Sequence, residues 1–236
     1  MKVGFFDSGV GGTCILRAFR SLRPDVETEY IADTANCPYG NKPPEEVVRL
    51  SEACTAKLLE RGCGMIVVAC NTATAAAIDH LRAKYAGIPF VGIEPAIKPA
   101  ALRSKTGVVG VLATAGTFSG RLYNETKARF AKNVTVLAVV ADEFVALVEG
   151  ERDTVARGGA IGSGASASRI EKVVRARIEP LLKAGADKIV LGCTHFPHLA
   201  PVIEKVCDGR AEVIDPSMSV ARQAVRMLER LERGRS

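Results

Sequence analysis

Short runs rich in Val and Ile alternate with longer amphipathic stretches along this chain of 236 residues, and this alternation restricts the possible fold most strongly. Continuous apolar strands that alternate with helices are typical of parallel sheets covered by helices on both faces. The predicted strands are 2–6, 28–32, 65–69, 89–93, 108–112, 134–139, 188–192 and 211–215. The predicted helices are 12–22, 44–61, 73–85, 95–103, 119–131, 169–184, 198–207 and 218–233. The sequence therefore predicts an α/β protein with mainly parallel sheets.

Two pairs of segments resemble each other within the chain. VGFFDSGVGG begins at Val3 and VGVLATAGT at Val109, whereas VVACNTATA begins at Val67 and VLGCTHFP at Val190. Each segment reads as a strand, a loop of small residues and the start of a helix. We interpret them as two similar α/β halves with a cysteine at the same place in each. The stretch GGAIGSGASAS (158–168) is interpreted as a flexible linker or as a lid over the site.

Composition excludes several classes of protein. The 32 basic and 26 acidic residues are intermixed, Trp is absent, and no cationic block carries interleaved aromatics, so a nucleic-acid partner is not expected. No apolar run approaches the about 18 residues of a spanning helix, so no membrane partner is expected either. The first residues lack the design of a signal peptide, which favours the cytoplasm. Seven cysteines, an odd number scattered over the chain, do not indicate a disulfide framework.

Two cysteines stand where ligands bind in open α/β sheets, just beyond the carboxyl ends of strands. Cys70 and Cys193 each end a predicted strand and precede a predicted helix. The positive end of a helix dipole is expected to lower a thiol pKa from about 8.5 toward neutrality. A thiol of that kind can either take or give a proton near pH 7. Two such cysteines in equivalent places favour proton-transfer chemistry over two buried spacers.

Other polar residues share these strand-end loops. Asp7 either assists a cysteine or caps the helix that begins near Gly11, and His195 has a structural and a functional interpretation of equal weight. Hydroxyls, amides and backbone N–H groups at helix starts suit carboxylates, so a dicarboxylic amino acid is a fitting ligand. The residues that supply them are Ser8, Asn71, Thr72, Thr114, Thr117 and Thr194.

Three rival sites fit the same residues less well. The glycines at 9, 11 and 12 do not match G-x-G-x-x-G, and no G-K-[ST] phosphate loop occurs. The segment from Cys193 to His198 lacks a matching Cys-x-x-Cys, so no metal is expected. Pyridoxal phosphate needs a Schiff-base lysine, and none of the strand-end loops holds one. We therefore expect neither cofactor nor metal.

Five motifs together resemble the cofactor-independent glutamate racemases, within the aspartate/glutamate racemase superfamily. They are FDSGVGG (6–12), DTANCPYG (33–40), ACNTATA (69–75), TAGT (114–117) and GCTHFP (192–197). Their order and approximate spacing hold from Lys2 to about Asp215. The resemblance implies two α/β domains related by a pseudo-twofold axis, with the active site in the cleft between them. It divides the chain into residues 1–94 plus 208–236, and residues 95–207.

The resemblance also implies roles for individual residues. Cys70 and Cys193 correspond to the catalytic cysteines, Asp7 and His195 to the groups that assist them, and Glu149 to a possible further assisting residue. The implied substrate-binding residues are Ser8, Pro38, Tyr39, Gly40, Asn71, Thr72, Thr114, Thr117 and Thr194. The expected function is interconversion of L- and D-glutamate to supply D-glutamate for peptidoglycan, in a homodimer.

Two alternatives remain open at this stage. One is a racemase for aspartate or another amino acid of the same superfamily, because one methylene is worth only about 1–3 kcal/mol of discrimination. The other is a protein that binds a dicarboxylic amino acid without catalysis. The presence of both cysteines and both assisting residues favours an enzyme.

Overall fold

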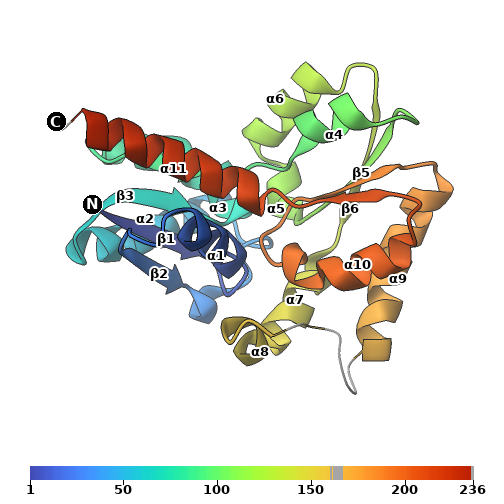
Figure 1. Ribbon diagram of the computed structural model, residues 1–236, viewed down its shortest axis with the longest axis horizontal. Coiled ribbons are helices and arrows are strands. Elements are labelled where there is room, and N and C mark those ends of the chain that lie inside the picture. The colour runs from blue at the N-terminus through green and yellow to red at the C-terminus, as the bar shows by residue number, and fades with distance from the viewer. Residues whose placement is uncertain (160, 162–166, 235–236) are drawn as a thin grey trace.

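The computed structural model describes residues 1–159, 161 and 167–234, and it contains two sheets of four parallel strands flanked by helices (Figure 1). The first sheet has the order β2-β1-β3-β4, and the second has the order β6-β5-β7-β8. The strands of the first sheet are β1 (Lys2–Asp7), β2 (Thr28–Ala32), β3 (Cys63–Val68) and β4 (Phe90–Gly92). Those of the second are β5 (Val108–Ala113), β6 (Thr135–Val140), β7 (Lys188–Leu191) and β8 (Glu212–Ile214). The matching order confirms the α/β fold with parallel sheets and the two similar halves.

The register of the central strands is equivalent in the two sheets. Phe6 of β1 pairs with Val68 of β3, and Leu112 of β5 pairs with Leu191 of β7. Val68 lies two residues before Cys70, and Leu191 lies two residues before Cys193. The internal similarity in the sequence therefore corresponds to equivalent positions at the ends of two central strands.

The predicted helices all appear, with small shifts at their ends. The helices of the first half are α1 (Thr13–Leu22), α2 (Pro44–Glu60), α3 (Asn71–Lys84) and α11 (Ser217–Arg233). The remaining helices are α4 (Ile97–Arg103), α5 (Ala115–Phe118), α6 (Arg121–Phe130), α7 (Asp142–Gly150), α8 (Arg152–Ala156), α9 (Ala167–Lys183) and α10 (Ala200–Cys207). Short 3₁₀ turns cover Thr34–Asn36 and Phe196–Leu199. The sequence did not predict α5, α7 or α8. Most of the segment interpreted as a linker or lid (residues 160 and 162–166) lies outside the described residues.

The C-terminal segment returns to the first half. α11 lies alongside the first sheet, and both chain ends are found in that half of the molecule (Figure 1). Its apolar face packs with α1 and β1, where Leu228 and Ala224 join Phe5 and Phe19 in one buried cluster. β8 pairs with β7 in the second sheet, whereas the predicted division at residue 208 assigns that strand to the first domain. The exact domain boundaries stay a prediction.

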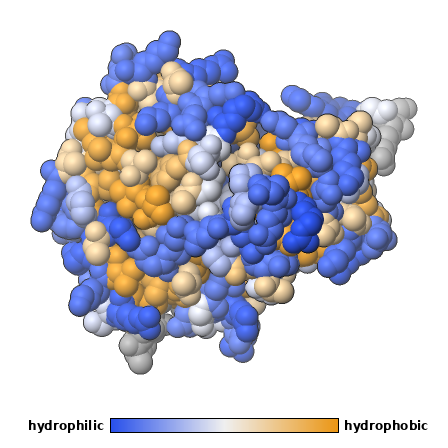
Figure 2. Space-filling model, turned by 180° about the vertical axis from the view of Figure 1, so that it is seen from behind, coloured by the Kyte–Doolittle hydropathy of each residue, from blue (hydrophilic) through white to orange (hydrophobic). Residues whose placement is uncertain are grey.

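Hydrophilic residues are spread over the face of the molecule shown in Figure 2, with apolar areas between them. Among the residues that the structure describes, no helix combines the length and apolar character needed to cross a bilayer.

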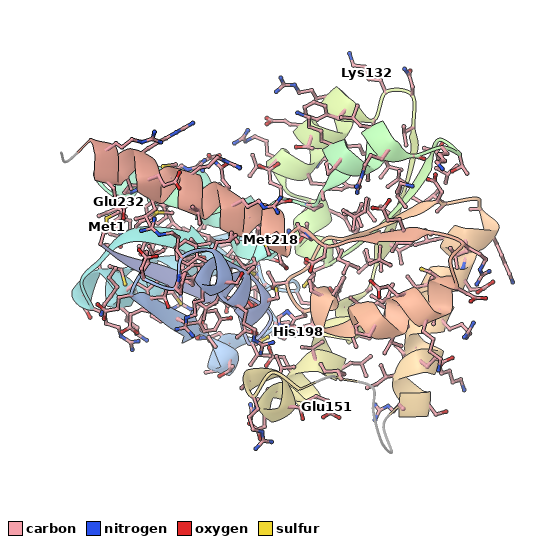
Figure 3. All side chains as sticks on the ribbon, viewed as in Figure 1. Met1, Lys132, Glu151, His198, Met218 and Glu232 are labelled. Atoms are coloured by element: carbon pink, nitrogen blue, oxygen red, sulfur yellow. The ribbon has the colours of Figure 1, made fainter. Side chains whose placement is uncertain are left out.

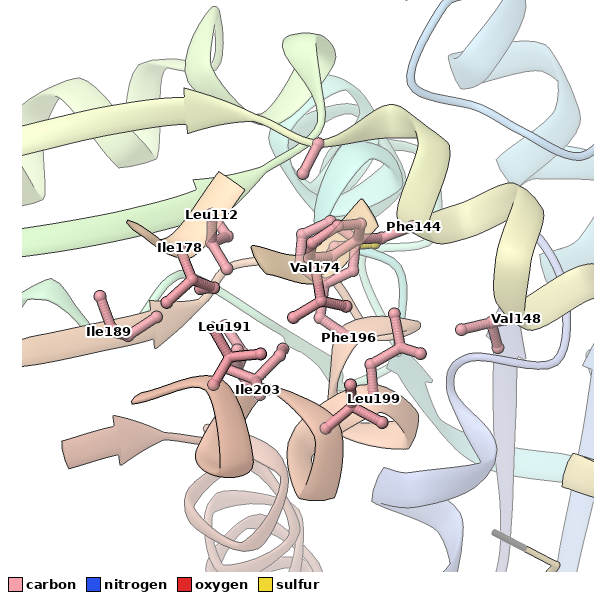
Figure 4. Close-up of a cluster of buried hydrophobic side chains, with 14 of the residues drawn as sticks. Leu112, Phe144, Val148, Val174, Ile178, Ile189, Leu191, Phe196, Leu199 and Ile203 are labelled. Carbon is pink, nitrogen blue, oxygen red and sulfur yellow. The ribbon is translucent and has the colours of Figure 1, made fainter. Parts of the chain in front are cut away.

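The core of the second half fixes α7 beside the loop that follows β7. Phe144 of α7 and Phe196 meet edge to face, with ring centroids 5.2 Å apart (Figure 4). Both rings are fully buried, and Val148 and Leu199 belong to the same cluster. Phe196 directly follows His195 in the chain, so this packing also limits where the imidazole can lie.

Replacing Phe196 with Ala removes one ring of this pair. We expect Phe196→Ala to lower the free energy of unfolding by about 3–5 kcal/mol, because a large buried cavity forms. Urea denaturation followed by circular dichroism measures the loss. Leu102→Ala is the control, since Leu102 is 71% exposed and its truncation should cost no more than about 0.5 kcal/mol. Equal losses in both variants would contradict the assigned core.

Candidate active site

The loops after four central strands meet between the two sheets. Asp7 ends β1, Cys70 follows β3, Thr114 follows β5, and Cys193 follows β7. Several hydrogen bonds join the two halves here. They include Thr194 Oγ1 to Asp7 Oδ1 (3.2 Å), Thr72 Oγ1 with Thr114 Oγ1 (2.9 Å), the Val10 amide to Glu149 Oε1 (2.9 Å), and the Gly116 amide to the Gly40 carbonyl (3.2 Å). The carboxyl edges of the parallel strands therefore form one shared polar region, as expected for an α/β ligand site.

Cys70 is the N-cap residue of α3. Its Sγ accepts a hydrogen bond from the Ala73 amide at 3.4 Å and lies 3.7 Å from Ser8 Oγ. Burial, reinforced by the Asp7 carboxylate, raises the pKa of Cys70 to about 12, against the opposing effect of hydrogen bonds from Ala73 and Ser8. The expected fall toward neutrality is therefore wrong for the free protein, because desolvation outweighs the helix terminus.

Cys193 lies in the equivalent loop of the second half, where it is 7% exposed. Its Sγ lies 3.7 Å from Nδ1 of His195. Burial raises the pKa of this thiol well above its ordinary value, and Cys70 and Asp7 act in the same direction. The expectation of a helix directly after Cys193 is also wrong, because a 3₁₀ turn intervenes and α10 begins only at Ala200. Cys70 is thus one of the groups that raise the pKa of the Cys193 thiol.

Asp7 was considered from the sequence either as the cap of the helix near Gly11 or as a group that assists a cysteine. It is fully buried, and its Oδ2 accepts a hydrogen bond from the amide of Gly12, the N-cap residue of α1. Its carboxylate also raises the pKa of the Cys70 thiol. Burial raises the pKa of Asp7 itself, against the opposing effects of His195 and of the hydrogen bonds that the carboxylate accepts.

His195 is held on its far side by a carboxylate. Its Nε2 lies 2.6 Å from Glu149 Oε1, while Nδ1 faces Cys193. Glu149, near the end of α7, also accepts a hydrogen bond from the Val10 amide. Burial raises the pKa of Glu149, but the hydrogen bonds from His195 and Val10 outweigh it and leave this pKa below its ordinary value. The ring therefore connects a carboxylate to a thiol.

The predicted substrate-binding residues do not all face the same space. The hydroxyls of Thr114 and Thr117 lie 3.0 Å apart, and Ser8 lies beside Cys70. The buried side-chain amide of Asn71 has no hydrogen-bond partner among the described residues, so its oxygen and nitrogen remain available. Pro38 forms a cis peptide bond with Cys37. Tyr39 lies in the core of the first half, with its hydroxyl donating to Asp33 at 2.6 Å.

A groove opens beside this region. It has a volume of about 800 Å³. The loop before α2 (including Gly40) and residues of α2, α3, α5 and α6 line it, among them Thr72 and Gly116. Neither Cys70 nor Cys193 lines it, and both thiols are nearly inaccessible to solvent. The groove thus reaches Thr72 of the site while the thiols stay enclosed.

Two residues near the site escaped the sequence reasoning. His198 lies where the two halves meet, with Nε2 3.1 Å from the Gly11 carbonyl (Figure 3). Burial lowers its pKa to about 4, so the neutral ring donates this hydrogen bond at pH 7. Cys37 lies beside Glu149 and His195. Cys37 lies within the motif DTANCPYG, and His198 directly follows the motif GCTHFP. Only the folded chain brings Cys37 next to His195.

Gly11 has no room for a side chain. A Cβ atom there would lie 2.7 Å from Nδ1 of His195 and 2.8 Å from its backbone nitrogen. Because backbone cannot move aside cheaply, we expect Gly11→Ala to displace His195 and to lower the unfolding free energy by about 1–3 kcal/mol. Thermal unfolding measures this loss. Gly87→Ala is the control, since nothing lies within 4 Å of a Cβ at that position. A Gly11→Ala variant as stable as the control would contradict the close contact.

The low pKa of Glu149 makes its contribution to stability depend on pH. The carboxylate stabilises the fold above its unfolded pKa of about 4.3, and this contribution disappears as the pH falls through the folded-state value. We expect Glu149→Gln to be less stable than the wild type by about 1.5–3 kcal/mol at pH 7, with the difference shrinking below about pH 4. Urea denaturation at several pH values measures it. Glu125→Gln, which affects an exposed pair with Arg121, should stay within about 0.5 kcal/mol. A difference that persists unchanged to pH 3 would contradict this role.

Comparison with known proteins agrees with this arrangement. The sequence model of the Asp/Glu/Hydantoin racemase family matches residues 13–224. A glutamate racemase of Herpetosiphon aurantiacus is 46% identical over 226 residues, which are 96% of this chain and 84% of that protein. The Escherichia coli glutamate racemase, solved with L-glutamate and the activator UDP-MurNAc-Ala, superposes with a TM-score of 0.83 at 35% identity, covering 97% of this chain and 82% of that one. The Francisella tularensis glutamate racemase, solved with D-glutamate, gives a TM-score of 0.79 at 26% identity over 98% of this chain and 82% of that one. On the family match and these identities, the chain belongs to the Asp/Glu/Hydantoin racemase family.

Proposed function

We propose that this protein is a glutamate racemase that moves a proton at Cα between two cysteines, Cys70 and Cys193, without a cofactor. The observation that carries the proposal is the equivalence of these thiols. Each is enclosed beyond a central strand of its own sheet, and each has a group at hand that can exchange its proton, Asp7 for Cys70 and His195 for Cys193. A one-base mechanism would have no need for this duplication.

Inversion of a stereocentre by proton transfer needs a base on one face of the carbon and an acid on the other. One cysteine, as thiolate, removes the α-proton while the other, as thiol, delivers a proton from the opposite side. In the reverse direction the two exchange roles. By resemblance to the family, Cys70 acts on D-glutamate and Cys193 on L-glutamate.

The high thiol pKa of the free protein fits a site in which the substrate itself activates the base. Burial and Asp7 keep the thiol of Cys70 protonated. The positive ammonium group of a bound amino acid would favour the thiolate, because an opposite charge nearby stabilises the charged form. Asp7 and His195 are the groups that accept the released proton, and the raised pKa of the buried Asp7 makes it a better acceptor. A thiolate therefore forms only when substrate is present.

The α-proton of an amino acid is very weakly acidic, so the site must stabilise a carbanion-like transition state. Hydroxyls of Ser8, Thr72 and Thr114, together with the free amide of Asn71, are buried donors for the substrate carboxylates. The near-complete burial of both thiols excludes water from the reacting atoms. Entry of substrate therefore requires the halves to open, and the groove lined by Gly40 and Thr72 is the side from which it would enter.

Glutamate is the proposed substrate because the related proteins are glutamate racemases and two of them were solved with L- or D-glutamate. Aspartate, one methylene shorter, is the alternative that a comparison of turnover on both acids would separate. By family resemblance, we also propose a cytoplasmic homodimer that supplies D-glutamate for peptidoglycan.

Removing either thiol should prevent inversion, because one face of the substrate then lacks its acid or base. We expect Cys70→Ala and Cys193→Ala each to lower racemisation by about 10²–10⁴-fold or more in both directions. Circular dichroism of glutamate at fixed wavelength follows the reaction. Cys63→Ala is the control, since the buried Cys63 begins β3, at the opposite end of that strand from Cys70. Near-normal turnover in either of the first two variants would refute the two-base mechanism, provided their thermal unfolding matches that of the control.

A further inference from the structure

Cys37, Glu149 and His195 form a cluster whose composition is unlike the rest of the site. Each residue offers one atom that can bind a metal: a thiol sulfur, a carboxylate oxygen and an imidazole nitrogen. These three atoms all lie within 4.8 Å of one another. The three residues come from separate parts of the fold: the loop after β2, the end of α7 and the loop after β7. Only His195 and Glu149 have a part in the proposed reaction, and Cys37 has none.

We propose that these three residues bind a thiophilic divalent cation such as Zn²⁺, and that the bound cation blocks the reaction. Thiolate, imidazole and carboxylate are the three ligand types that zinc takes in proteins, and three protein ligands with one open position are the usual set of an accessible zinc site. The cation-binding step stands on the cluster alone. The blocking step rests on the proposed function.

The distances permit this with small side-chain movements. Zn²⁺ bonds of about 2.0–2.3 Å in a tetrahedron separate the ligand atoms by about 3.3–3.7 Å. The present atoms lie within 4.8 Å, and the hydrogen bond between Glu149 and His195 is 2.6 Å long. The cation would take the place of the proton in that hydrogen bond, and the thiol of Cys37 would release its proton to solvent.

The surroundings supply what a zinc site needs beyond its ligands. The Val10 amide already orients the Glu149 carboxylate, and outer partners of this kind are part of a metal site. Glu149 lines a surface groove of about 600 Å³ beside α8. Cys37 and Glu149 are both only partly buried, whereas His195 is enclosed. The proposed approach of the cation is therefore from the α8 side, where Glu149 is the first ligand that it meets.

Blocking follows from the position of the imidazole. His195 presents Nε2 to the cluster and Nδ1 to the Cys193 thiol. A cation on Nε2 fixes the ring and prevents it from exchanging a proton with Cys193.

Isothermal titration with Zn²⁺ and the absorption of the Co²⁺ form test the binding step. The wild type is expected to bind one Zn²⁺, and its Co²⁺ form to show a thiolate-to-metal charge-transfer band. Cys37→Ser should lose that band and weaken Zn²⁺ binding by at least about 100-fold, since even outer partners cost about 10–100-fold. Cys37→Val, with an apolar side chain of similar size, is the second variant in case the hydroxyl disturbs folding. Cys207→Ser, buried in the second-half core, is the matched control and should bind as the wild type does.

Racemase assays with added Zn²⁺ test the blocking step. Zn²⁺ should inhibit the wild type and Cys207→Ser at equal concentrations, whereas Cys37→Ser should keep its basal activity and need at least about 100-fold more Zn²⁺. Zinc binding that survives in Cys37→Ser but disappears in Cys70→Ala would overturn the assigned site. Binding at Cys37 without inhibition would overturn the blocking step. A wild type that binds zinc but racemises nothing would instead refute the proposed function, because the titration and the Co²⁺ band do not depend on turnover.

Discussion

The carboxylate of Asp7 accepts hydrogen bonds from the Gly12 amide and the Thr194 hydroxyl, and no part of it reaches solvent. A buried carboxylate is costly unless such donors compensate it, so the ends of β1 and β7 are held together at this point. The contact fixes the start of α1, joins the two halves and places negative charge beside Cys70. The same carboxylate adds to the effect of burial in raising the pKa of the Cys70 thiol.

In the second half, a different set of contacts holds His195 at the active site. Packing of Phe144 against Phe196 brings α7 beside the loop that follows β7, and Glu149 at the end of that helix fixes His195. The imidazole therefore lies between a carboxylate and a thiol, where it can relay a proton. The same position exposes it to Cys37, so the feature that suits proton transfer also creates a place where a soft cation can bind.

Much of this could be predicted from the sequence, because the signals are local. All eight strands follow from apolar runs, and the equivalence of Cys70 and Cys193 follows from their places at strand ends. α7 was missed although Phe144, Val145 and Val148 have helical spacing, because the segment continues directly from the apolar run of β6. The thiol pKa values could not be predicted, since they depend on burial between two halves. The position of Cys37 beside His195 likewise depends on contacts between distant parts of the chain.

In the proposed mechanism two thiols act on opposite faces of one carbon. Incubation of the wild type with L-glutamate in heavy water tests this mechanism most directly. Optical rotation reports inversion, and nuclear magnetic resonance reports deuterium at Cα. Two bases predict that the rotation decays to zero and that newly formed D-glutamate carries deuterium, while the remaining L-glutamate is still largely protonated early in the reaction. D-Glutamate that retains the original α-hydrogen would contradict the account, because a single base would then have carried the proton across. Glutamate binding without any exchange at Cα would also contradict it, and would indicate a binding protein instead.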